Sequence, residues 1–121
     1  MRPVQIEETR LLFNTIYSYL GKDGGITINK KRQRPTEGYV AGICKGPVFP
    51  SLESVMSGEV MRWIDSIPED EYIGAWLSPE GVVYFDRVQV FENLSDALFE
   101  AKANNEMAVY DLNGKTVIDV P

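Results

Sequence analysis

The chain has 121 residues, and its 12 basic and 18 acidic side chains give a formal net charge of −6. This length suits one domain, so we expect residues 1–121 to form a single domain with its own core. No run of about 18 apolar residues occurs, which predicts no membrane span. The charge is too low for a mimic of duplex DNA, which carries one charge per about 1.7 Å, and its sign disfavours stable DNA binding.

The sequence contains no histidine and one cysteine. Without histidine, the most common general base and metal ligand is missing, as are Ser-His and Cys-His nucleophile pairs. We therefore expect no metal site and no cofactor. The lone Cys44 cannot form an internal disulfide, and the N-terminus does not resemble a signal peptide, which together predict a cytoplasmic protein. Cys44 itself is interpreted as a buried apolar residue.

The N-terminal part predicts one helix followed by two strands. Apolar residues at helical spacing form one face of the helix, which is expected to end with Gly21 at its C′ position. β-branched residues predict a strand at 26–29, and a second strand is expected at 39–44, where Gly46-Pro47 breaks it. The apolar face of the helix consists of Ile6, Leu12, Phe13, Ile16, Tyr17 and Leu20.

The middle of the chain predicts a second helix and a hairpin. The helix covers residues 59–66, with Ser57 as its N-cap. The strands at 72–77 and 82–91 are joined by Ser78-Pro79-Glu80-Gly81, whose proline and glycine positions suit a type I turn.

The C-terminal part predicts a third helix and a second hairpin. Asn93 is expected to cap this helix with Asp96 as the capping-box acid, and Asn104-Asn105 suits the end of the helix. Asn113-Gly114 then predicts a hairpin whose two central residues both have positive φ. The chain is thus expected to be an α+β protein, with an antiparallel sheet of about six strands and about three helices mostly on one face.

The densest group of cations predicts a site for an anionic ligand. Arginine side chains suit phosphate, and aromatic rings can stack on a base. The alternatives are a solvated loop or an edge strand protected by charge. The candidate ligand-binding residues are Lys30, Lys31, Arg32, Arg34, Arg87, Trp76 and Phe85.

Asp86 interrupts an otherwise apolar strand and shares a face with Tyr84 and Val88. A buried carboxylate must be paired or protonated. Asp86 is therefore either an edge, bulge or hydrogen-bonded structural residue, or one member of a catalytic carboxylate pair. The second interpretation requires another carboxylate at a defined distance.

Residues 72–118 resemble small phage- and prophage-encoded accessory proteins. The resemblance rests on the segments AWLSPEGVVYFD (75–86) and NEMAVYDL (105–112), with Ala97 and Ala101 between them. It implies a phage gene expressed in a bacterial cytoplasm, and proteins of this class often counter host immunity. Some are inhibitors of immune effectors, and others sequester nucleotide signals, as the anti-Thoeris proteins do.

We therefore expect a non-catalytic phage counter-defence protein that sequesters a small phosphorylated nucleotide. One alternative is a stoichiometric inhibitor of a host immune protein, and another is a histidine-free hydrolase that uses carboxylates. The apolar residues on both faces of the 82–91 strand also predict a homodimer or higher homo-oligomer formed through the uncovered sheet face.

Overall fold

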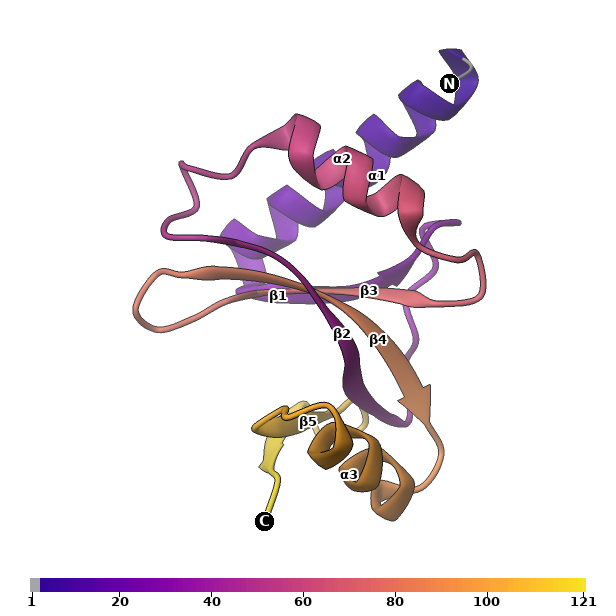
Figure 1. Ribbon diagram of the computed structural model, residues 1–121, viewed down its shortest axis with the longest axis vertical. Helices are drawn as coiled ribbons and strands as arrows, with labels where there is room; N and C mark the ends of the chain where they lie inside the picture. The colour runs from indigo at the N-terminus through magenta and orange to yellow at the C-terminus, as the bar shows by residue number, and fades with distance from the viewer. Residues whose placement is uncertain (1–2) are drawn as a thin grey trace.

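The computed structural model describes residues 3–121, with side chains from residue 7 onward. All neighbouring strands are antiparallel and form one curled sheet in the order β1-β3-β4-β2-β5-β6 (Figure 1). The predicted α+β class is therefore confirmed. In chain order the elements are α1 (Pro3–Asp23), β1 (Gly25–Asn29), β2 (Tyr39–Phe49), α2 (Ser57–Ser66), β3 (Tyr72–Leu77), β4 (Val83–Phe91), α3 (Leu94–Ala103), β5 (Ala108–Asp111) and β6 (Thr116–Asp119).

The larger core lies where α1 and α2 cover one side of β1, β3 and β4 (Figure 1). The predicted apolar face of α1 is confirmed from Leu12 to Leu20, while the side chain of Ile6 lies outside the described part. Phe85 is fully buried at the centre, where Phe49 and Trp63 meet its ring edge to face at 6.0 and 5.9 Å. Such contacts add to the burial of apolar surface.

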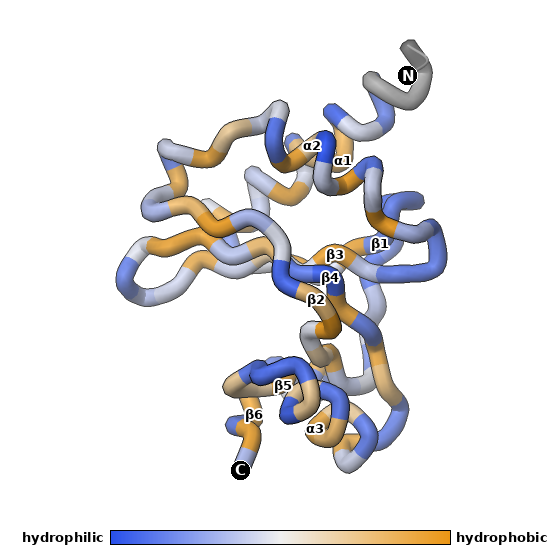
Figure 2. Tube along the Cα trace, viewed as in Figure 1, coloured by the Kyte–Doolittle hydropathy of each residue, from blue (hydrophilic) through white to orange (hydrophobic). Residues whose placement is uncertain are grey.

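A smaller core forms where α3 packs on β2 and β5, at the other end of the molecule (Figure 1). Ala97 and Ala101 are fully buried, and their small side chains let the helix approach Ala41 and Val109 closely. Apolar residues concentrate along the strands, while the connections between elements are mostly hydrophilic (Figure 2). Within residues 3–121, no helix combines the length and the apolar composition needed to cross a membrane.

Two predicted helix ends are wrong by a few residues. The first helix continues past Gly21 to Asp23, and Gly24 with φ of 81° ends it instead. Ser57 is the first residue of α2, and Met56 occupies the N-cap position. The end of α3 is confirmed, since Asn105 has the left-handed φ of 58° that asparagine tolerates.

Asn93 takes the predicted N-cap position of α3, but its side chain makes no capping bond to the backbone. Its amide nitrogen donates to Asp96 at 3.3 Å instead. The reciprocal capping box is therefore wrong, although the helix begins where the sequence predicts.

Both hairpins are confirmed. In the first, the amide of Gly81 donates to the Ser78 carbonyl at 2.9 Å, and Gly81 has φ of 91°. In the second, the predicted turn conformation is wrong, because Lys115 has the positive φ of 54° in place of Asn113 and Gly114. The loop instead depends on Asp111, whose carboxylate accepts the amides of residues 113 and 114 at 3.0 and 3.2 Å.

The predicted break at Gly46-Pro47 is wrong, because β2 continues to Phe49. Two register shifts against β4, between Gly42 and Cys44 and between Lys45 and Val48, accommodate the irregular segment. A bulge tolerates proline, which cannot donate a ladder hydrogen bond. The prediction of a buried Cys44 is also wrong, since its side chain is exposed.

Candidate functional site

One face of the sheet is left uncovered by α1 and α2. Along β4, Val83 and Phe85 point into the core, so Tyr84 and Asp86 point to the opposite side. The strand register places three rows of residues across that side. We call it the open face. The first row consists of Val48, Tyr84 and Trp76, and the second consists of Lys45, Asp86 and Gly74. The third row consists of Gly42, Val88 and Tyr72. Beyond it, Tyr110 on β5 lies beside Val40.

The first row of the open face presents large apolar surface to solvent. Trp76 is 53% exposed, and its ring stacks on Tyr84 with centroids 5.6 Å apart and planes inclined by 24°. Val48, which pairs with Tyr84 on the other side, is 54% exposed. Rigid, exposed aromatic rings of this kind are enriched at protein interfaces.

The second row brings the carboxylate of Asp86 close to that of Glu106. Burial and then the negative charge of Glu106 raise the pKa of Asp86, against the opposing effects of Lys45 and the Gly46 amide, and the net result is a pKa of about 6. Lys45 Nζ lies 3.7 Å from Glu106 Oε2, and the lysine side chain is largely exposed. Asp86 can therefore change its protonation state near neutral pH.

Glu106 reaches this row from the connection between α3 and β5 because Gly42 has no side chain. A Cβ at position 42 would overlap Glu106 Oε1 and lie 2.8 Å from its Cδ. Oε1 is buried and has no hydrogen-bond partner among the described residues. A buried acceptor without a donor is costly, and this oxygen lies against Gly42, shielded from solvent.

This arrangement can accept hydrogen bonds and attract a cation. The sequence identified Asp86 but not Glu106, although a glycine in a strand such as Gly42 indicates a bulge or a close approach. Within residues 3–121, no group of three or more acidic or cysteine side chains is placed to hold a metal ion.

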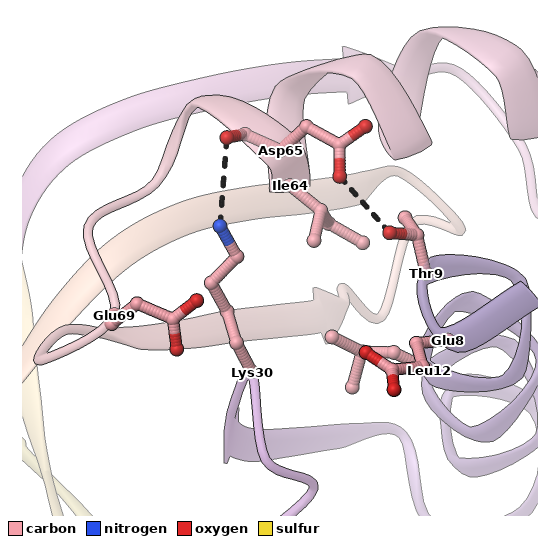
Figure 3. A pocket seen from close by; sticks show the side chains of 7 residues that line it. All are labelled: Glu8, Thr9, Leu12, Lys30, Ile64, Asp65 and Glu69. Atoms are coloured by element: carbon pink, nitrogen blue, oxygen red, sulfur yellow. Dashed lines mark hydrogen bonds between the residues drawn. The ribbon is translucent and has the colours of Figure 1, made fainter. Parts of the chain in front are cut away.

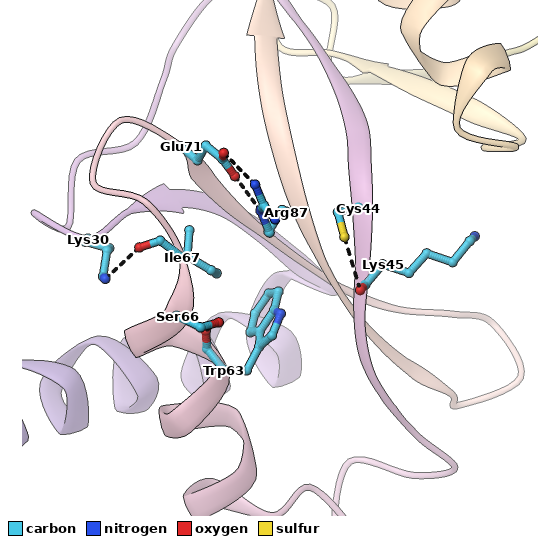
Figure 4. Close-up of polar contacts among 8 residues, drawn as sticks. All are labelled: Lys30, Cys44, Lys45, Trp63, Ser66, Ile67, Glu71 and Arg87. Atoms are coloured by element: carbon cyan, nitrogen blue, oxygen red, sulfur yellow. Dashed lines mark hydrogen bonds and ion pairs between the residues drawn. The ribbon is translucent and has the colours of Figure 1, made fainter.

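Two of the four cations in the predicted basic site make contacts within the protein. Lys30 Nζ donates to the Ile67 carbonyl at 2.8 Å and lies 3.5 Å from the Asp65 carbonyl, at the C-terminal end of α2 (Figures 3 and 4). A cation is stabilised there by the free carbonyls of the helix end. The Arg34 guanidinium lies over the Tyr19 ring, 4.4 Å from its centroid, while Lys31 and Arg32 are exposed.

The cavity beside Lys30 is acidic. It has a volume of about 270 Å³, and Glu8, Asp65 and Glu69 line it together with Lys30 (Figure 3). Thr9 donates to Asp65 at 2.9 Å across the gap between α1 and α2. Lys30 is already hydrogen-bonded to the protein, and three carboxylates surround it. The cavity would therefore repel the negative charge of a phosphate group.

The remaining predicted residues do not lie together. Arg87 makes two bonds of 2.5 and 2.6 Å to the Glu71 carboxylate (Figure 4). These bonds hold the pKa of Glu71 below its ordinary value. Arg87 alternates with Asp86 and so lies on the opposite side of the sheet from Trp76. Phe85 is fully buried and its ring is inaccessible to a ligand.

Comparisons with known proteins return no relationship for this chain: no family model matches it, and neither does a curated protein or a solved structure.

Proposed function

We propose that this protein is a non-catalytic binding protein that docks a partner protein on the open face. The observation that carries the proposal is the exposed Trp76–Tyr84 stack beside Val48, on a sheet face that α1 and α2 do not cover. Most binding energy at protein interfaces comes from a few residues, among which tryptophan and tyrosine are enriched.

The charges on the open face favour a partner protein that has basic side chains beside the apolar surface that contacts Trp76 and Tyr84. Asp86 and Glu106 lie in the row beside the aromatic stack, and the whole chain carries a net charge of −6. Lys45 is the opposing cation in that row, and its side chain is 66% exposed. An arginine or lysine of the partner would be attracted by the negative charge of the two carboxylates.

A protein partner is favoured over a nucleotide. Lys30 and Arg87 already bind protein groups, and three carboxylates line the cavity at Lys30. The resemblance of residues 72–118 to phage accessory proteins makes a host immune protein the expected class of partner, with the chain acting as its stoichiometric inhibitor. Nucleotide sequestration would instead need cations and rings on one surface.

The test compares Trp76→Ala with Phe99→Ala, because Phe99 is a 73% exposed aromatic residue on α3. Each variant should lose less than about 1 kcal/mol of stability, since neither ring is in the core. A protein captured from bacterial lysate by the wild type, once purified, should bind at one to one by calorimetry. Trp76→Ala should weaken that affinity at least about 30-fold, as loss of an aromatic hot spot does.

Phe99→Ala should leave the affinity within about twofold, because the residue lies away from the open face. Equal affinities for the wild type and Trp76→Ala would reject the open face as the docking surface. Saturable binding of a nucleotide, with no effect of Trp76→Ala on protein capture, would favour sequestration instead.

A further inference from the structure

A second cavity, of about 490 Å³, lies at the far end of the open face from Trp76. Its lining includes Tyr72 of the open face, Val90, which pairs with Val40 at the end of that face, and the segment from Pro35 to Gly38 that precedes β2. This volume falls within the range of about 300–1,000 Å³ that is usual for ligand sites.

The lining combines aromatic residues with negative charge. Three aromatic residues, Tyr39, Tyr72 and Phe91, line the cavity together with two acidic residues, Glu37 and Glu92. No lysine or arginine among residues 7–121 lines the cavity, and neither glutamate has an ion-pair partner in that part of the chain. Both glutamates are exposed, so their charges face solvent at the cavity.

The walls of the cavity are fixed by the fold. Gly38 has φ of 104°, and a Cβ there would lie 2.8 Å from the Phe91 carbonyl oxygen. Its amide donates to Asn113 Oδ1 at 3.0 Å, and its carbonyl accepts the Leu112 amide at 2.9 Å. Tyr39 and Phe91 also pack against the α3 core. A cavity with such supports needs little rearrangement to receive a ligand.

We infer that this cavity receives an arginine side chain of the partner that docks on the open face. A planar guanidinium can stack on an aromatic ring and donate in parallel to a carboxylate, which a compact ammonium does less well. The inference depends on the proposed function for the source of the arginine, whereas the cation-binding chemistry of the cavity stands independently of it.

The experiment uses the whole protein and two defined probes, N-acetyl-arginine amide and N-acetyl-citrulline amide, which differ in charge but closely match in shape. Titration followed by amide NMR should give saturable shifts at Gly38 and Asn113 with the arginine probe. We expect at least about fivefold weaker binding of the citrulline probe, and weaker arginine binding at high salt. Equal binding of the two probes would overturn the inference.

Variants at the cavity provide the matched control. A double variant that carries Glu37→Gln and Glu92→Gln should bind the arginine probe about threefold to tenfold more weakly, as expected for the loss of two exposed charges. Glu80→Gln, which removes one charge from the exposed β3–β4 turn, should change it less than about twofold. Unchanged binding in the double variant would overturn the inference. Because no partner is used, that result would leave the Trp76 experiment unaffected.

Discussion

Asp86 shows how one residue can be predicted while its environment cannot. Alternation along the strand predicts that it shares a face with Tyr84 and Val88, and the register confirms this. Its neighbour Glu106 lies 20 positions later in the chain and approaches only because position 42 is glycine. No local pattern links Asp86 to Glu106, so a carboxylate pair formed by tertiary packing escapes sequence reasoning.

Replacement of Asp86 should reveal an unusual pH dependence of stability. The folded pKa of about 6 exceeds the ordinary value of 3.8, so the folded state disfavours the ionised carboxylate. Ionisation therefore destabilises the fold above pH 6, and this cost is relieved as the pH falls from about 6 to 4. Asp86→Asn should be about 1–3 kcal/mol more stable than the wild type at pH 7.5.

Urea unfolding at pH 7.5 and pH 4 would measure this effect. The advantage of Asp86→Asn should largely disappear at pH 4, where the native carboxyl is already protonated. Asp70→Asn, an equal change of charge in an exposed loop, serves as the control and should change stability by less than about 0.5 kcal/mol at either pH. A less stable Asp86→Asn at pH 7.5 would contradict the proposed burial of charge.

At the scale of elements, local turn and periodicity signals locate the helices and both hairpins. Pro79 with Gly81, and Asn113 with Gly114, each place a turn correctly. The sequence does not predict the positive φ at Lys115, because the longer loop is selected by hydrogen bonds that the Asp111 carboxylate accepts from the backbone. The sequence also does not predict the full length of β2. Gly46-Pro47 indicates the end of a strand unless the pairing with a neighbouring strand is known.

The continuation of β2 depends on Gly46, over which the Trp63 ring packs. A Cβ at position 46 would lie 2.5 Å from the ring and 2.7 Å from the Phe85 carbonyl oxygen. Gly46→Ala should therefore cost about 1–3 kcal/mol through overpacking. Gly58→Ala, in the first turn of α2 with ordinary space for a methyl group, should be neutral or stabilise by up to about 1 kcal/mol.

Thermal melts of the two glycine variants would separate these effects. Opposite shifts in Tm, or a fall for Gly46→Ala alone, would agree with the close approach of Trp63 to β2. A Gly46→Ala protein that melts with the wild type would show that the ring can move away, and the packing between α2 and β2 would then be looser than described.

At the scale of the whole molecule, the helices leave one sheet face with exposed aromatic residues. The basic run from Lys30 to Arg34 was predicted as the ligand site, yet Lys30 binds the end of α2 and Arg34 lies over Tyr19. Tyr19 lies 15 positions before Arg34, and Ile67 lies 37 positions after Lys30, so the sequence alone does not separate cations that bind within the fold from cations that are free to bind a ligand. The predicted homo-oligomer remains a prediction, with a second copy as the competing occupant of the open face.

Site-specific photo-crosslinking would test the open face most directly. A photoreactive phenylalanine analogue would replace Trp76 or Val48, and in control proteins Phe99 or Leu11, which are similarly exposed on α3 and α1. We predict that positions 76 and 48 form an adduct with the same partner protein, with positions 99 and 11 forming none. Equal adducts at all four positions, or adducts at 76 and 48 only with a second copy of this chain, would contradict docking of a different protein on the open face.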